Sequence, residues 1–163
     1  MKKLLFAAMI ISVTTWSACG NSAQEEARLE RKAEMAKKIE EESKIPASER
    51  ITLDSKGVGP IKNLPLDEVI DEEMVQRGME LFKTNCSACH KVDKRFIGPS
   101  PKGIMTRRSP EWIMNMILDP QLMVEQDRCA KDLLVEFNGA AMANQNLTEE
   151  QARDILEYFR TLE

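Results

Sequence analysis

Cys86-Ser87-Ala88-Cys89-His90 places two thiols and an imidazole within one short stretch of this chain. Two cysteines three positions apart can add to the two vinyl groups of one haem, and a histidine directly after the second cysteine can bind the iron. His90 is the only histidine among the 163 residues, so the chain has no second histidine for the iron. The motif predicts one covalently attached haem c. Methionine is the expected protein ligand at the sixth coordination position of the iron.

A Cys-x-x-Cys pair also occurs in dithiol redox sites and as half of a zinc site. The redox interpretation requires a strand–helix context, and the sequence around Cys86 shows none. A zinc site needs four ligands, and beyond the motif the chain offers at best the distant Cys129. Haem is therefore favoured over both. Cys129 is predicted to be a small buried apolar residue, with a reactive or intermolecular thiol as the alternative.

The start of the chain has the pattern of an export signal. Two lysines precede an apolar run over residues 4–13, which is shorter than a membrane-spanning helix requires. Small residues before Cys19 resemble a bacterial lipobox, with Trp16 where an aliphatic residue is usual. Residues 1–18 are predicted to be a lipoprotein-type signal peptide and Cys19 the lipid-modified residue. Ordinary cleavage or an uncleaved anchor is the alternative, and each interpretation places the mature chain outside the inner membrane.

Residues 19–65 are predicted to be a lipid-anchored charged spacer and linker. Residues 24–44 are rich in charge and alanine and lack Gly and Pro, which favours a solvated helix, with a disordered spacer as the alternative. Residues 45–65 carry five Gly and Pro residues and are expected to form a linker or an extended arm. A helical tether would lift a globular domain clear of the lipid.

Residues 66–163 are predicted to form one all-α domain of a usual size for a single core. Helices are expected over residues 66–85, 109–119, 120–137 and from Thr148 onward, where Gln151 completes a capping box. Gly78 in the first helix predicts close contact with another helix, because Gly costs about 1 kcal/mol relative to Ala there. The domain has 18 acidic and 12 basic residues, which argues against nucleic acid as a partner.

The order of these features resembles the class I cytochrome c family over residues 66–163: a helix, the CxxCH motif, a Gly-Pro loop, a middle helix, a methionine and a capped terminal helix. The resemblance implies the class I fold, with helices packed around one covalently bound haem c. It also implies that the Gly78 region crosses the terminal helix. Pro99 resembles the proline whose carbonyl accepts a hydrogen bond from the proximal histidine, although Pro101 stands where the family commonly has Leu.

Met142 matches the family's ligand methionine, because it lies in a loop of small residues before the capped terminal helix. Met123 or an open site is the alternative. The resemblance thus implies His90 and Met142 as the iron ligands, with Cys86, Cys89 and Pro99 completing the cofactor site. An iron with both axial positions filled has no vacancy for substrate, so an electron carrier is predicted rather than an enzyme, with no catalytic residues.

The predicted function is single-electron transfer by a membrane-tethered monohaem cytochrome on the periplasmic side of a bacterial membrane. Its partners would be redox proteins, and the acceptor a terminal reductase such as nitrous oxide reductase, because the chain resembles small cytochrome lipoproteins that accompany such enzymes. Two alternatives stay open. One is a gas-binding or sensing module with an open or weakly ligated iron, and the other is a fixed cytochrome subunit of a larger respiratory complex.

Residues 91–108 are locally basic, with six Lys and Arg residues against the single acid Asp93. One interpretation is a docking surface for an acidic redox partner, which would speed encounter at low salt. The other is that one or two arginines hold the haem propionates while the remaining cations are solvated.

Overall fold

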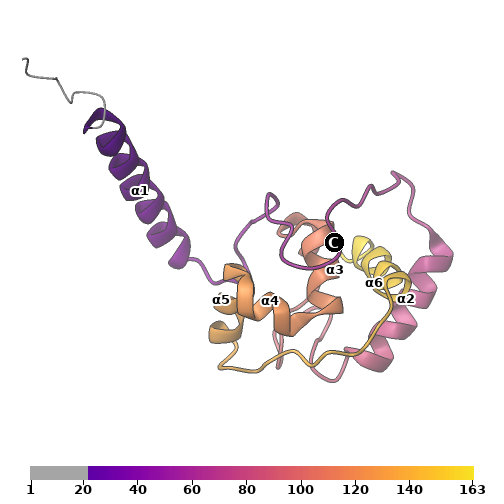
Figure 1. Ribbon diagram of the computed structural model, residues 1–163. Coiled ribbons are helices and arrows are strands. Elements are labelled where there is room, and N and C mark those ends of the chain that lie inside the picture. Colours follow the sequence, from indigo (N-terminus) through magenta and orange to yellow (C-terminus); the bar gives the residue numbers. More distant parts are fainter. Residues whose placement is uncertain (1–21) are drawn as a thin grey trace, which may run out of the picture. The chain divides into compact units, whose positions relative to one another are not determined.

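The computed structural model describes residues 22–163, which form six α-helices and one short 3₁₀ helix, with no β-strand in that range (Figure 1). The chain divides into two compact units, of which the second is Glu42–Glu163. The all-α prediction is confirmed. The predicted signal peptide and the lipidation residue Cys19 lie outside the described residues. No helix among residues 22–163 is both long enough and apolar enough to span a membrane.

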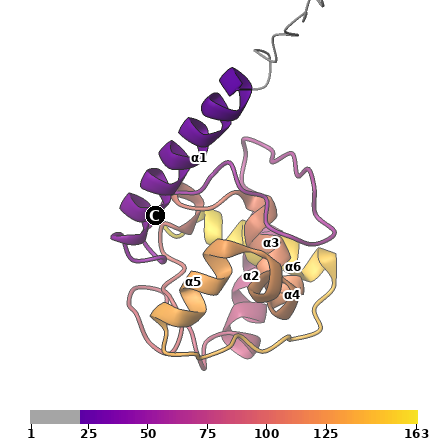
Figure 2. The ribbon, with the colours of Figure 1, turned by 60° about the vertical axis from the view of Figure 1, so that its left-hand side comes forward.

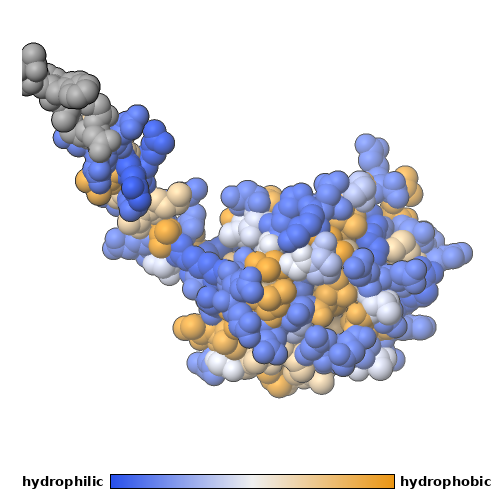
Figure 3. All heavy atoms as spheres, in the orientation of Figure 1, coloured by the Kyte–Doolittle hydropathy of each residue, from blue (hydrophilic) through white to orange (hydrophobic). Residues whose placement is uncertain are grey.

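Helix α1 (Ser22–Ser43) corresponds to the charged segment, so the structure contains the helical form of the two alternatives. Its surface is mainly hydrophilic, with isolated apolar side chains (Figure 3). Leu29 and Met35 are 58% and 61% exposed, so neither side chain is buried in the described structure. The helix therefore behaves as the solvated element that its composition predicts.

Helices α2 (Glu72–Asn85) and α6 (Glu149–Arg160) cross in close contact and lie side by side in both ribbon views (Figures 1 and 2). Gly78 lies at the crossing, where a Cβ atom would be 2.0 Å from the carbonyl oxygen of Asp154. One turn further along α2, the Phe82 ring centroid lies 5.7 Å from those of both Tyr158 and Phe159. The predicted close contact at Gly78 is therefore confirmed.

Capping side chains define where these two helices begin. Helix α2 begins at Glu72 rather than at residue 66, because the Asp71 side chain accepts hydrogen bonds from the first backbone N–H groups. The Asp71 backbone N–H itself donates to Glu157 Oε1 at 3.0 Å. Helix α6 has the predicted capping box, in which Thr148 and Gln151 bond reciprocally.

The middle of the domain contains the 3₁₀ helix η1 (Ile104–Thr106) and helices α3 (Pro110–Leu118), α4 (Pro120–Gln126) and α5 (Arg128–Glu136). The single helix expected over residues 120–137 is wrong, because Asp127 interrupts it in an extended conformation. Asp127 Oδ1 accepts from the Ala130 backbone N–H at 2.8 Å and from Trp112 Nε1 at 3.1 Å. One carboxylate thus starts a new helix and satisfies a buried indole.

Residues 46–65, called the arm below, pack on the helical core instead of forming a free linker. Ala47 and Ile61 are buried. The side chain of Asn115, which is completely buried, donates to the carbonyls of Lys56 and Ile61 at 2.9 Å and accepts from the Ile61 N–H at 3.0 Å. The compact unit therefore includes the arm, whereas the sequence placed the domain start at residue 66.

Candidate haem site

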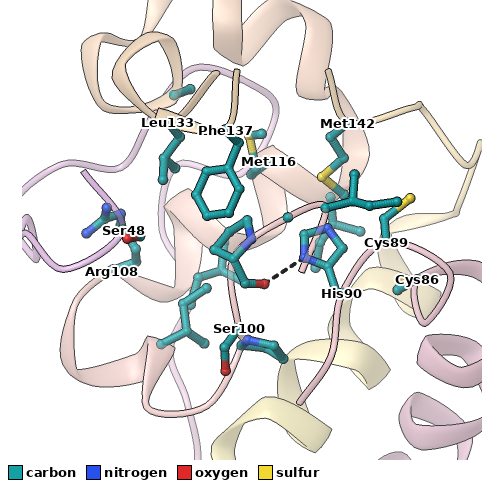
Figure 4. A pocket seen from close by; sticks show the side chains of 18 of the residues that line it. Ser48, Cys86, Cys89, His90, Ser100, Arg108, Met116, Leu133, Phe137 and Met142 are labelled. Atoms are coloured by element: carbon teal, nitrogen blue, oxygen red, sulfur yellow. Dashed lines mark hydrogen bonds between the residues drawn. The ribbon is translucent and has the colours of Figure 1, made fainter. Parts of the chain in front are cut away.

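A cavity in the domain brings the predicted site residues together (Figure 4). Cys86, Cys89, His90, Pro99 and Met142 all line it. The rest of the wall is mostly apolar and comes from α2, α3, α5, α6 and the loops between them; among its members are Phe82, Trp112, Ile113, Leu133, Phe137, Ile155 and Phe159. A flat apolar cofactor with a reactive edge suits a cavity of this composition.

The two thiols lie directly after the end of α2. The backbone turns tightly there, since the N–H groups of Cys89 and His90 both donate to the Cys86 carbonyl, at 3.0 and 2.9 Å. Both cysteines are free thiols; Cys86 is half-buried and Cys89 is exposed. Burial, followed by the neighbouring Cys89, raises the pKa of the Cys86 thiol to about 11, so this group is protonated at neutral pH before any thioether forms.

His90 is held by the Gly-Pro loop. Its Nδ1 donates to the Pro99 carbonyl oxygen at 2.8 Å, since a carbonyl can only accept, and this leaves Nε2 as the nitrogen with a free lone pair. Gly98 lies against the same ring, where a Cβ atom would be 2.4 Å from His90 Cε1. The sequence placed Gly98 in this loop, but the reason that only glycine fits there appears with the structure.

Met142 lies in the extended stretch between α5 and α6, and its side chain points into the cavity that His90 also lines (Figure 4). The stretch begins and ends with left-handed turns at Asn138, Gly139 and Asn146. The hydrogen bonds formed from Ala140 to Asn146 are local and join residues at most three positions apart. Met142 is therefore placed by the path of the chain rather than by a packed helix.

The other methionines take different positions. Met123 does not line the cavity and is completely buried. Its sulfur accepts a hydrogen bond from the Val58 backbone N–H at 3.1 Å, so Met123 binds the arm to the helical core. Met116 on α3 also lines the cavity, although nothing in the sequence singled it out. Its position two residues after buried Met114 gave no sign of this, because both methionines fit a helix pattern equally well.

The basic stretch 91–108 is largely taken up by internal contacts. Arg95 pairs with Glu136 at 2.7 Å and lies 3.9 Å from the centre of the Phe137 ring. Arg107 donates to the Lys102 carbonyl at 3.0 Å, and Arg108 is buried. Among the cations of this stretch, Lys94, Arg95 and Lys102 are exposed.

These residues fit a covalently bound haem. The cavity offers two thiols for the vinyl groups, an imidazole already oriented by a backbone carbonyl, and an apolar wall that limits water. An imidazole held in this way binds iron more strongly than one without such a bond, because the hydrogen bond at Nδ1 fixes the ring and raises its basicity.

Comparison with known proteins gives a consistent result. A family model described as cytochrome c matches residues 75–163. Cytochrome c from Rhodothermus marinus shares 42% identity, with a TM-score of 0.62, over 72% of this chain and 93% of that one. An engineered form, Rma TDE, shares 40% identity, with a TM-score of 0.62, over 74% of this chain and 96% of that one. No curated protein matches.

A further structure of the engineered Rhodothermus marinus protein is described as bound to a carbene intermediate; it shares 40% identity, with a TM-score of 0.60, over 74% of this chain and 96% of that chain. The helix order matches the class I fold, and Cys86 and Cys89 are placed for the CxxCH motif through which the family holds covalent haem c. The family match covers the thiols, the imidazole and the terminal helix together. This chain belongs to the cytochrome c family.

Proposed function

We propose that the chain is a carrier of single electrons whose haem iron is held between His90 and Met142. The observation that carries this proposal is that both side chains point into one cavity, with His90 fixed through its other ring nitrogen by Pro99. When bound, the haem supplies an iron that alternates between the ferric and ferrous states. With the His90 nitrogen and the Met142 thioether as its ligands, the iron would have no vacancy for substrate.

The chain's own residues contribute orientation and a dry environment. The Pro99 carbonyl keeps the His90 ring in one tautomer and one orientation, and the apolar wall excludes water. Low polarity around an iron disfavours the more highly charged ferric form, so the wall raises the reduction potential together with the thioether ligand. A histidine fixed in this way moves little between oxidation states, which favours rapid electron exchange.

Electrons would enter and leave at the thioether edge. Cys89 is exposed, and Phe96 and Ile97, in the loop whose Gly98 N–H donates to the Cys89 carbonyl, are 50% and 48% exposed. Ile97 also lines the cavity. This side therefore offers a short path from the cofactor to a docked protein, more directly than the dispersed cations of residues 91–108.

For its setting, we propose a lipid anchor at Cys19 after removal of residues 1–18, with residues 19–45 between the lipid and the unit that the arm forms with the helices. This arrangement would keep the protein on the periplasmic side of a bacterial membrane, and helix α1 would act as the spacer. The donor and acceptor would be redox proteins, with a terminal reductase such as nitrous oxide reductase as a candidate acceptor. Metabolic labelling with a fatty acid, compared between the natural chain and a Cys19→Ala variant, tests the anchor.

The visible spectrum of the matured protein tests the iron ligation. We expect a far-red sulfur-to-iron band in the ferric form and a ferrous form that does not bind carbon monoxide. Prompt binding of carbon monoxide without the far-red band would refute a His90/Met142 site.

Prompt binding of carbon monoxide without the far-red band would favour a gas-binding or sensing module. One observation supports this alternative: the stretch carrying Met142 is held by local hydrogen bonds, so its ligand is easier to displace than one on a packed helix. A third possibility, a fixed subunit of a respiratory complex, predicts copurification of other subunits that resists high salt.

A further inference from the structure

Arg95 and Glu136 join the two loops that carry the proposed iron ligands. Arg95 lies in residues 91–101, called the proximal loop below, which contains the Pro99 carbonyl that orients His90. Glu136 is the last residue of α5, and residues 137–147, called the methionine loop below, follow it and carry Met142. A contact between Arg95 and Glu136 therefore connects the loop that holds one ligand to the start of the loop that holds the other.

This contact has three parts. Arg95 Nη1 donates to Glu136 Oε1 at 2.7 Å, and Arg95 Nη2 donates to the Glu136 backbone carbonyl oxygen at 2.6 Å. The guanidinium also lies 3.9 Å from the centre of the Phe137 ring, which is buried and forms part of the cavity wall (Figure 4). A planar guanidinium can donate along its edges while its face stacks on a ring. Arg95 thus fixes both backbone and side chains where the methionine loop leaves α5.

The arm supports the Glu136 carboxylate from another direction. The Ser48 backbone N–H donates to Oε2 at 2.8 Å, and the Ser48 hydroxyl donates to Oε1 at 2.6 Å. Burial alone would raise the pKa of Glu136, but the hydrogen bonds from Ser48 and Arg95 hold it below its usual range, so the carboxylate is ionised at neutral pH. Ser48 precedes residue 75, where the family match begins, so this support comes from outside the matched region.

The rest of the methionine loop has weaker attachments. The hydrogen bonds formed from Ala140 to Asn146 are local, and the far end of the loop is held by the capping box of Thr148 and Gln151. A segment with mainly local bonds opens at low cost unless its ends are fixed. The contact with Arg95 therefore determines how readily Met142 can leave the cavity.

We propose that Arg95 and Glu136 are positioning residues that keep Met142 on the haem iron by tying the methionine loop to the proximal loop. This inference deepens the proposed electron-transfer function and rests on it. An exposed ion pair usually contributes little. Here, however, the Glu136 side chain is only 14% exposed, and the backbone bond and the ring contact add to the pair. Loss of the contact would leave His90 bound while increasing the fraction of molecules in which Met142 has left the iron.

The test is the binding of imidazole to the ferric form of the matured full-length protein at neutral pH, followed by loss of the far-red band. Imidazole needs the coordination position that Met142 occupies, so its apparent affinity rises with the fraction of molecules in which this position is open. Arg95→Gln removes the charge and the forked contact. We expect imidazole to bind this variant roughly tenfold more tightly, with the far-red band still present before imidazole is added.

Arg77→Gln is the matched control. Arg77 pairs with Asp154 through two hydrogen bonds, at 2.9 and 2.8 Å, and its side chain is 53% exposed, as is that of Arg95. This pair joins α2 to α6 and does not touch the methionine loop, so we expect the natural affinity for imidazole. Equal tightening in Arg95→Gln and Arg77→Gln would show a general loss of stability and overturn the proposal. The natural affinity in Arg95→Gln would overturn it too.

A double-mutant cycle tests whether the two residues act as a pair. Glu136→Gln should also tighten imidazole binding, and the double variant should bind no more tightly than the tighter single variant. Effects that multiply in the double variant would mean that the residues act separately, which contradicts the proposal. If Arg95→Gln fails to accumulate with haem, Glu136→Gln is compared with Arg77→Gln instead, and the natural affinity there overturns the proposal.

Amide hydrogen exchange in residues 137–147 is a second readout, because the N–H groups of Asn138, Gly139 and Ala140 are hydrogen-bonded at the start of this loop. We expect faster exchange there in Arg95→Gln and the natural rate in Arg77→Gln; the natural rate in both would contradict the proposal. A missing far-red band in the natural protein would reject the His90/Met142 site and this inference with it. A far-red band together with the natural imidazole affinity in Arg95→Gln would reject only the role of Arg95 and Glu136.

Discussion

Adding one methyl group at Gly98 should disable the proximal histidine. A Cβ there would lie 2.4 Å from His90 Cε1, about 1 Å inside the 3.4 Å at which ordinary contact begins. The backbone cannot move away freely, because the Gly98 N–H donates to the Cys89 carbonyl at 2.9 Å. The ring must therefore turn, and its 2.8 Å bond to Pro99 is the contact that breaks.

The cost of Gly98→Ala follows from these two contacts. Overpacking a tight contact costs about 1–3 kcal/mol, and the lost hydrogen bond adds about 1 kcal/mol. For a domain of this size, a total of roughly 2–4 kcal/mol corresponds to a fall in melting temperature of roughly 8–16 °C. Because the ring also leaves the iron axis, the ferrous form should bind carbon monoxide.

Gly78→Ala is the matched control, since its Cβ would be even closer to a neighbour, at 2.0 Å from the Asp154 carbonyl oxygen. That clash lies at the α2–α6 crossing, so it should lower the melting temperature without giving carbon monoxide access to the iron. The assay is thermal melting followed by ferrous spectra of both variants. A Gly98→Ala protein with the natural melting temperature and no carbon monoxide binding would refute the argument.

Three further changes have separate readouts. Met142→Ala should remove the far-red band and open the iron to carbon monoxide; Met116, also in the wall, is the residue to replace next if the band persists. Asp127→Ala should lower the free energy of unfolding by about 1–3 kcal/mol, because it removes the α5 cap and leaves the Trp112 indole N–H unpaired, as denaturant titration will show. Burial alone would raise the pKa of Glu157, but hydrogen bonds from Arg160, the Asp71 backbone and Arg153 hold it below its usual range. The ionised Glu157 carboxylate therefore stabilises the fold at pH values above the usual glutamate pKa of about 4.3, and this stabilisation is lost as pH falls through the lower pKa of the folded state. Glu157→Gln should lower the melting temperature at neutral pH, and the difference from the natural protein should shrink in melts at acid pH.

The parts that the sequence predicted well are those whose cause is local. The CxxCH motif and the capping box at Thr148 depend on side chains within a few positions of one another, so their order in the chain is enough to predict them. The hydrogen bond from His90 to Pro99 spans nine positions, and it was inferred from the family resemblance and not from spacing.

Asp127 shows where local reasoning fails. Within a run of helix-forming residues, an aspartate at that position is compatible both with an exposed side of one long helix and with a cap that divides it. The choice depends on Trp112, whose indole N–H needs an acceptor at that place in the folded core. The deciding contact is tertiary, so periodicity along residues 120–137 could not reveal it.

The packing of the arm likewise depends on tertiary contacts that the local sequence does not reveal. Its Gly and Pro residues correctly predicted an irregular backbone, and an irregular backbone can pack only if other groups satisfy its N–H and C=O groups. Those groups are the side chains of Asn115 and Arg108, which lie more than fifty positions further along the chain. Asn115 is completely buried within an apolar helix, and a buried polar side chain of this kind is a signal that some backbone must come to meet it. Arg108 gives the same signal, because carbonyl groups of the arm accept the hydrogen bonds that its buried guanidinium donates.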